Sequence, residues 1–147
     1  RQGVKSKPFS AVSMPSVADT YTAREAKASL EAGYVVVLGG GIGNPFFTTD
    51  TASTLRAIEL ECDVVLKGTK VDGVYSDDPK KNPDAIRYDQ ISFDDVISQN
   101  LKVMDTAALA LARDSRMPII VYSLDDAAGL SGILEGRGAS TLVGDKR

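Results

Sequence analysis

The fold of this chain is decided by the stretch Tyr34-Val-Val-Val-Leu38 and the residues after it, Gly39-Gly-Gly-Ile-Gly-Asn-Pro-Phe-Phe-Thr-Thr-Asp50. The apolar run predicts a strand covered on both faces, and a helical pattern begins near Thr51. A strand, a glycine-rich loop and a helix start together present backbone N–H groups to a phosphate. Four glycines within five residues let the main chain approach a ligand without Cβ clashes. The stretch therefore predicts an anion-binding loop in an α/β fold.

This glycine loop (residues 39–50) does not match the two familiar phosphate signatures. A Walker loop needs a Lys after its glycines, and none follows here. In the dinucleotide fingerprint the third glycine would fall at Asn44, and Asp63 opens the next strand instead of closing it. The alternative is a glycine-rich turn without a ligand. Phe46 and Phe47 argue against that alternative, because adjacent aromatic residues in a loop usually pack on something.

Composition and charge narrow the class of protein. The 147 residues predict one domain, residues 1–147, with 43% hydrophobic and 25% charged residues and a net charge of −3. An acidic balance does not suggest a nucleic-acid partner. Without histidine, any acid–base or metal chemistry must use carboxylates, lysines or the ligand itself, and no metal site is predicted.

Cys62 is interpreted as a small core residue in a reducing compartment. No apolar run approaches 18 residues and the first residues are polar, so neither a membrane span nor a signal peptide is expected.

Strand-like and helix-like segments alternate along the chain. Thr22 with Glu25, and Ser92 with Asp95, are typical of helix capping boxes, and Gly33 is typical of a helix stop. Strands are expected at 9–14, 34–38, 63–67, 119–123 and 141–143, and helices at 22–32, from about 51 to 62, 92–99, 106–113 and 127–134, with 86–91 ambiguous. Thr49 or Asp50 is the expected cap of the second helix, and the pair Asp72-Gly73 predicts a tight turn.

This alternation predicts an α/β domain with a mainly parallel sheet sandwiched by helices. Ligands of such sheets lie at the carboxyl ends of the strands. The loops after Leu38, Leu66 and Ser123 are therefore expected to meet at one edge of the sheet.

Several side chains at that edge could handle a phosphorylated ligand. Lys67 and Lys70 follow a predicted strand, where a lysine can neutralise phosphate charge during transfer. Alternatively, both are solvated lysines at a strand end. Tyr75 could stack on a base, and Thr69 and Asp78 could bind polar groups or merely shape turns. Asp50 and Asp105 could orient a lysine or a magnesium–phosphate group, or could simply cap helices.

Three segments together resemble the bacterial uridylate kinases (UMP kinases) of the amino-acid kinase, or carbamate kinase-like, fold family. They are Gly41 to Ser53, Asp63 to Pro79, and Leu101-Lys-Val-Met-Asp105. The similarity runs in order, with compatible spacing, from about residue 9 to the end. The run Gly-Asn-Pro-Phe-Phe-Thr-Thr-Asp is specific to these enzymes within the family, whereas Lys-x-Thr-x-Val-Asp-Gly-Val-Tyr is shared more loosely.

The resemblance implies phosphoryl transfer from ATP to UMP, giving UDP, with Mg²⁺, in a cytoplasmic hexamer that serves pyrimidine nucleotide synthesis. It implies catalytic roles for Lys67 and Asp50, and ATP contacts from Thr69, Tyr75 and Asp78. It also implies that UMP is bound by the run 42–49, which consists of Ile42, Gly43, Asn44, Pro45, Phe46, Phe47, Thr48 and Thr49.

The chain departs from the family pattern in one large respect. A Lys-x-Ser-Gly segment and a Gly-Gly-Gly-Asn loop, which the family carries in its amino-terminal half, do not occur here. We therefore expect the chain to be the carboxyl-terminal part of such an enzyme and to be inactive alone, since phosphoryl transfer depends on positioning. The alternatives are a nucleotide-binding or metal-storage protein on the same fold, or a kinase of another small acceptor.

Overall fold

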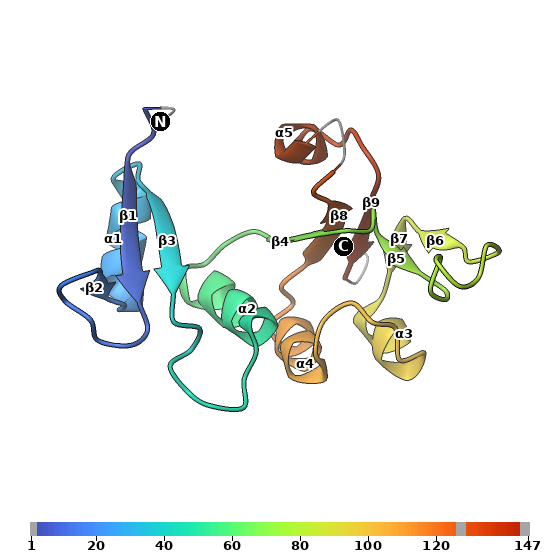
Figure 1. Cartoon of the computed structure of the whole chain (residues 1–147), viewed down its shortest axis with the longest axis horizontal. Coiled ribbons are helices and arrows are strands. Elements are labelled where there is room, and N and C mark those ends of the chain that lie inside the picture. The colour runs from blue at the N-terminus through green and yellow to red at the C-terminus, as the bar shows by residue number, and fades with distance from the viewer. Residues whose placement is uncertain (1–2, 126–128, 145–147) are drawn as a thin grey trace. The chain divides into compact units, whose positions relative to one another are not determined.

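The computed structural model describes residues 3–125 and 129–144, and these divide into two compact units, Arg1–Cys62 and Asp63–Arg147 (Figure 1). Each unit carries its own parallel strand pairs and its own helices. The α/β class with mainly parallel strands is confirmed. The organisation of residues 1–147 as one domain stays a prediction.

The first unit is built on a three-stranded parallel sheet with the order β2-β1-β3. Its strands are β1 (Ser6–Ser10), β2 (Asp19–Thr20) and β3 (Val35–Gly39), and its helices are α1 (Ala23–Glu31) and α2 (Thr49–Glu59). Phe9, Ala26 and Leu60 form a small core, because a strand, α1 and the end of α2 each turn one apolar side chain inward. β1 ends earlier than the predicted 9–14, and Met14 instead forms an isolated bridge with Ala18.

β3 is covered on one face only among the described residues, so the expected cover on both faces is wrong there. Val36 and Leu38 pack on the small core, while Val35 and Val37 are 52% and 55% exposed. Successive side chains of a strand point to opposite faces, so the apolar run supplies one inward face and one open valine face. Apolar composition alone could not distinguish these two arrangements.

The helix boundaries of this unit follow from side-chain capping. The Thr22 hydroxyl accepts from the Glu25 amide, and Gly33 has a φ of 82°, which confirms the predicted start and stop of α1. At α2 the cap is Thr48 and not Thr49 or Asp50. Cys62 is exposed, which corrects its interpretation as a core residue.

The second unit contains a four-stranded sheet with the order β4-β8-β9-β7 and a separate two-stranded antiparallel pair, β5-β6. β4 and β8 are parallel, and Thr69 pairs with Ser123 at their carboxyl ends. The loops after these two strands therefore lie at one edge, as predicted, whereas the glycine loop belongs to the other unit. The strands are β4 (Val65–Thr69), β5 (Val74–Tyr75), β6 (Arg87–Tyr88), β7 (Gln90–Ile91), β8 (Ile119–Ser123) and β9 (Ser140–Val143).

The helices of the second unit are α3 (Phe93–Ser98), α4 (Thr106–Asp114) and α5 (Gly129–Leu134). Ser92 caps α3 by accepting from the Asp95 amide, as its capping box predicts. Asp105 caps α4 by accepting from the Ala108 amide at 3.0 Å. The predicted start of the last helix, residue 127, lies outside the described residues.

Gly73 is required by a close approach of side chains and does not sit in a hairpin turn. β4 pairs with β8 and β5 pairs with β6, so the residues between β4 and β5 connect two different sheets. A Cβ on Gly73 would collide with the Thr141 hydroxyl and would lie 3.0 Å from Cδ of Arg87. The predicted tight turn at Asp72-Gly73 is therefore corrected to a connection between two sheets, in which Gly73 packs against the buried Thr141.

Candidate functional site

The glycine loop of the first unit is folded tightly against the end of β1. The Gly43 amide donates to the Gly40 carbonyl at 3.1 Å, and both glycines have positive φ, 78° and 76°. A Cβ on Gly40 would lie only 3.3 Å from the amide nitrogens of Ala11 and Val12. The glycines therefore serve a turn and a close backbone approach, the two roles for which a side chain is excluded.

The second half of this loop is open to solvent. Residues 43–49 are exposed and Ile42 is half-buried. Phe46 is fully exposed and has a φ of 68°, and Phe47 is 52% exposed. Within the described residues these aromatic rings do not pack as the sequence suggested. A left-handed conformation costs a residue with a Cβ roughly 1–2 kcal/mol, so Phe46 is held in an unfavourable geometry on an open surface.

The start of α2 fixes the residues that end the glycine loop. The Thr48 hydroxyl accepts from the amides of Asp50 at 3.1 Å and Thr51 at 3.4 Å. Asp50 is half-buried in the first turn of α2, where a carboxylate is favoured by the helix dipole. Thr54, which is fully buried, donates its hydroxyl to the Asp50 carbonyl at 3.1 Å. The backbone at Asp50 is therefore anchored from both sides.

A network of three side chains contacts the same loop through Arg56. Arg56 donates to the Glu59 carboxylate at 2.7 Å and to the Gly41 carbonyl at 3.3 Å. The guanidinium carbon lies 3.9 Å from the ring centre of Tyr21, whose hydroxyl donates to the same carboxylate at 2.7 Å. Sequence reasoning missed this network, because Tyr21 lies 38 residues before Glu59 and the three residues match no motif.

The environment of this network shifts two pKa values. Burial first, and then the hydrogen bond and charge of Glu59, raise the pKa of Tyr21 to about 12. Burial would by itself raise the pKa of Glu59, but the hydrogen bonds from Tyr21 and Arg56 and the Arg56 charge together lower it. The network therefore holds a neutral phenol and an ionised carboxylate over the neutral pH range.

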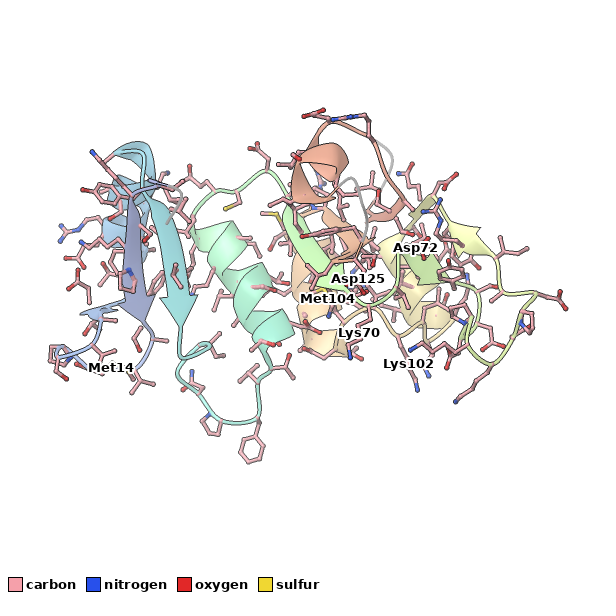
Figure 2. The ribbon with its side chains drawn as sticks, turned by 45° about the horizontal axis from the view of Figure 1, so that its top comes forward. Met14, Lys70, Asp72, Lys102, Met104 and Asp125 are labelled. Atoms are coloured by element: carbon pink, nitrogen blue, oxygen red, sulfur yellow. The ribbon has the colours of Figure 1, made fainter. Side chains whose placement is uncertain are left out.

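The second unit contains a cavity of about 600 Å³, large enough for a nucleotide. It takes in the end of β4, the β4–β5 connection, β5 and the loop after it, the segment after α3, and Val121 of β8. The lining residues are Lys67, Thr69, Val71, Gly73, Val74, Tyr75, Ser76, Asp77, Asp78, Pro79, Lys81, Gln99, Asn100, Leu101, Lys102, Val103 and Val121. Figure 2 shows Lys70 and Asp72 on the connection after β4, and Lys102 on the segment after α3.

Lys67 and Thr69 lie on the same face of β4, because side chains two residues apart in a strand share a face. Both line the cavity, and Lys67 pairs in register with Val121, which also lines it. The Thr69 hydroxyl accepts from the Val71 amide at 2.9 Å and donates to the Val71 carbonyl at 2.7 Å, so it shapes the chain as it leaves the strand. Lys70 is exposed and does not line the cavity.

The acidic and aromatic side chains of the cavity are tied to its wall. The Tyr75 hydroxyl donates to Asp72 at 2.7 Å, and this bond, with some burial, raises the pKa of Tyr75. Asp78 accepts from the Lys80 amide at 3.0 Å and lies 3.9 Å from the Lys81 ammonium. The structure therefore brings together four of the predicted residues, namely Lys67, Thr69, Tyr75 and Asp78.

One wall of the cavity, residues 99–103, was not predicted as part of a site. Asn100 has a φ of 52° directly after α3, and the Leu101 amide donates to the Val96 carbonyl at 3.0 Å. This left-handed stop turns the chain so that Lys102 and its neighbours line the cavity. Asparagine tolerates this conformation, so Asn100 after a short capped helix was the signal available in the sequence.

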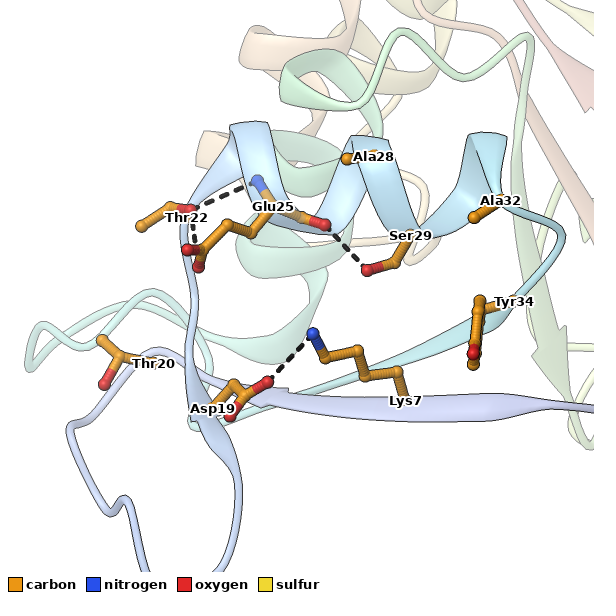
Figure 3. Close-up of a pocket in the computed structure, with 9 residues that line it drawn as sticks. All are labelled: Lys7, Asp19, Thr20, Thr22, Glu25, Ala28, Ser29, Ala32 and Tyr34. Atoms are coloured by element: carbon orange, nitrogen blue, oxygen red, sulfur yellow. Dashed lines mark hydrogen bonds and ion pairs between the residues drawn. The ribbon is translucent and has the colours of Figure 1, made fainter.

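A second hollow, of about 720 Å³, lies in the first unit (Figure 3). Lys7 and Asp19 form an ion pair at 3.0 Å on one side of it, and the capping pair Thr22 and Glu25 lies on the other. Tyr34 also lines it, and none of the predicted site residues does.

No group of three or more histidine, cysteine or carboxylate side chains within residues 3–125 and 129–144 could hold a metal ion by itself. Magnesium is usually held by one or two carboxylates together with substrate phosphates, so the cavity carboxylates Asp77 and Asp78 fit such a partial set. Over the same residues, no helix is long and apolar enough to cross a membrane.

Comparison with known proteins identifies the family. A model described as the amino acid kinase family matches residues 1–123. The chain is 52% identical over 143 residues to the uridylate kinase of Brucella abortus biovar 1, and 51% identical to that of Anaplasma marginale, in each case over 97% of this chain. These alignments cover 60% and 58% of the two relatives.

Solved structures show the same similarity in three dimensions. The UMP kinase from Bacillus anthracis matches 100% of this chain and 61% of its own, with a TM-score of 0.95 and 38% identity. The UMP kinase from Ureaplasma parvum matches 97% of this chain and 61% of its own, with a TM-score of 0.92 and 36% identity. The chain thus spans about 60% of the length of the curated relatives it matches. The chain belongs to the amino acid kinase family.

Proposed function

We propose that this chain is the nucleotide-binding part of an enzyme that transfers a phosphoryl group from ATP to UMP, giving ADP and UDP. The observation that carries the proposal is the cavity at the carboxyl end of β4, where Lys67, Thr69, Tyr75 and Asp78 lie together. Ligands of α/β sheets bind at this end of the strands. The relatives that share half of the residues of this chain are uridylate kinases, which supports UMP as the acceptor.

The cavity suits the adenosine and phosphates of ATP. Val71, Val74 and Leu101 provide apolar surface for a base, and the Tyr75 ring provides an aromatic face. Thr69 and Asp78 offer polar atoms for the ribose or the base. The lysines of the cavity, Lys67, Lys81 and Lys102, supply the positive charge that a triphosphate requires.

The glycine loop suits the acceptor. Residues 42–49 are mostly exposed, and the run ends with the hydroxyls of Thr48 and Thr49 at the start of α2. Backbone amides and the helix dipole at such a position favour a phosphate. In the proposed reaction an oxygen of the UMP phosphate attacks the γ-phosphorus of ATP, and the bond from that phosphorus to the bridging oxygen breaks as ADP leaves.

Lys67 and Asp50 are the proposed catalytic residues. A lysine beside the transferred phosphoryl group stabilises charge that builds up on the equatorial and leaving oxygens. Asp50 would orient the reacting groups from the helix start. Mg²⁺, when bound with ATP, neutralises phosphate charge, and Asp77 or Asp78 would be the carboxylates that hold it in the cavity.

The test is a steady-state assay of the full gene product with ATP, Mg²⁺ and a panel of acceptors. UMP should be the preferred acceptor, and a panel in which UMP is inactive while an amino acid or another small phosphate is turned over would overturn the proposal. Binding of ATP without turnover of any acceptor would favour a storage or binding role. Lys67→Ala should reduce kcat more than it raises the KM for ATP, because a charge that acts in the transition state is lost.

Two variants separate the acceptor loop from the donor cavity. The double substitution Thr48→Ala with Thr49→Ala should raise the KM for UMP more than the KM for ATP. The reverse pattern would mean that the acceptor has been placed wrongly. The 147-residue chain alone should form no UDP at an appreciable rate, and a rate similar to that of the full gene product would contradict this expectation.

The proposal extends to assembly and location. A hexamer in the cytoplasm, serving pyrimidine nucleotide synthesis, follows from the resemblance to uridylate kinases. Sedimentation equilibrium of the full gene product tests the hexamer directly, and a monomer at micromolar concentration would refute it.

A further inference from the structure

The Arg56 side chain of α2 hydrogen-bonds the glycine loop at Gly41, directly before the run 42–49 that is proposed to bind the acceptor. The Arg56 side chain is 13% exposed, and its guanidinium donates to the carbonyl of Gly41 at 3.3 Å. The other end of the guanidinium is fixed by Glu59 at 2.7 Å and by the Tyr21 ring beneath it. Because Glu59 and the Tyr21 ring both restrain the planar guanidinium, it has little freedom to move away from the Gly41 carbonyl.

The consequence of this contact follows from peptide geometry. A trans peptide is planar, so its C=O and N–H point in opposite directions. The Gly41–Ile42 peptide is trans, since the chain contains no cis peptide bond among the described residues. With the Gly41 carbonyl turned toward Arg56, the N–H of Ile42 points to the opposite side of the loop. Ile42 is the first residue of the run 42–49 proposed to hold the acceptor.

This peptide is the central one of a turn, which the Gly43 amide closes onto the Gly40 carbonyl at 3.1 Å. It turns through ψ of Gly41 and φ of Ile42, and Gly41, with a φ of 62° and no neighbour within 4 Å of a Cβ built on it, leaves its part of that motion open. The bond from Arg56 adds a restraint on the peptide. If it rotated, a carbonyl oxygen would face the side on which a phosphate must find an N–H.

We propose that Arg56 is a positioning residue that holds the Gly41–Ile42 peptide in the orientation that presents the Ile42 amide to an anionic acceptor. Glu59 and Tyr21 hold the guanidinium in place. The proposal rests on the proposed function for the identity of the acceptor, a nucleoside monophosphate, but the orientation of the peptide itself is independent of that identity.

The test compares Arg56→Met with Tyr21→Phe and Arg56→Lys in the full gene product. Arg56→Met keeps much of the aliphatic stem and loses the donors, so the KM for UMP should rise about tenfold, the effect of losing one well-placed hydrogen bond to a charged group, with the KM for ATP nearly unchanged. Arg56→Lys should recover part of the loss, because one ammonium can reach either the carboxylate or the carbonyl. Tyr21→Phe keeps the ring beside the guanidinium and removes only the hydroxyl bond to Glu59, so it should raise the KM for UMP much less than Arg56→Met does.

A second measurement decides the matter even if UMP proves not to be the acceptor. Amide hydrogen exchange of residues 39–47 in the free protein should be faster in Arg56→Met, and the increase should be much smaller in Tyr21→Phe. Equal exchange in Arg56→Met and the parent would overturn the proposal. A rise in both KM values together, with a lower melting temperature and no local change in exchange, would also overturn it, because that pattern indicates a merely structural role. A parent with no activity toward UMP refutes the proposed function and leaves the exchange comparison valid.

Discussion

Thr141→Val hardly changes the shape of the side chain, yet the structure predicts that it strongly lowers the stability of the protein. Thr141 is fully buried in β9, and its hydroxyl accepts from the Val74 amide at 2.8 Å and donates to the Tyr88 carbonyl. It thereby ties the β5–β6 pair, which leads into the cavity, to the four-stranded sheet. Valine has nearly the same volume but no hydroxyl, so both backbone groups lose their partner.

The magnitude follows from the buried donor and acceptor left behind. An unsatisfied buried backbone group costs about 1–3 kcal/mol. Val74 is buried but Tyr88 is only half-buried, so one full penalty and a smaller second one predict a loss of about 2–3 kcal/mol. Thr141→Ser is the matched control, since it keeps the hydroxyl and removes one methyl group, at a cost of about 1 kcal/mol. The valine variant should therefore be the less stable of the two.

Urea unfolding of the full gene product measures the difference, and hydrogen exchange of residues 72–88 locates it. We expect faster exchange in that segment for Thr141→Val and little change for Thr141→Ser. If the valine variant is as stable as the serine variant, or if its exchange is unchanged at Val74, the hydroxyl does not hold the β5–β6 pair and the reasoning fails.

Three further predictions concern other positions. Gly73→Ala should destabilise the protein by about 1–3 kcal/mol through overpacking, whereas Gly39→Ala, whose Cβ would find its nearest neighbour at 3.7 Å, should be tolerated; equal urea midpoints would contradict this. Tyr75→Phe should keep the affinity for ATP measured by calorimetry, while Tyr75→Ala should weaken it, because the ring and not the hydroxyl would contact the base. Since the pKa of Tyr21 is raised to about 12, its stabilising bond to Glu59 is fully present below pH 10 and is lost as the pH rises toward 12. The difference in urea midpoint between the parent and Tyr21→Phe should therefore shrink between pH 9 and pH 11.5, and a constant difference would refute the pKa shift.

Much of the local structure was predictable because single residues determine it. Thr22 and Ser92 start helices through their hydroxyls, and Gly33 ends one through its positive φ, so the pattern of residue types was enough. The strand Ile119–Ser123 was also predicted at its observed bounds. Such features depend on neighbours a few residues away, which the sequence displays directly.

The errors arose where distant residues decide the outcome. Whether β3 is covered on both faces depends on what packs against it, and Val35 and Val37 look the same in sequence either way. Gly73 was interpreted as a turn glycine, because its collision with Thr141 involves a residue 68 positions later. Four of the predicted site residues line the cavity of the second unit, but its wall at residues 99–103 depends on the left-handed stop at Asn100.

The exposed valine side chains of β3 affect how the 147-residue chain behaves in solution when it is prepared by itself. In the sheet order β2-β1-β3, β3 is a terminal strand, so one row of its backbone N–H and C=O groups has no strand partner within the described residues. An edge strand with exposed Val35 and Val37 is a template onto which another chain can add a strand. The 147-residue chain should accordingly self-associate as its concentration rises, and a lysine at position 35 or 37 should suppress this without disturbing the core on the opposite face.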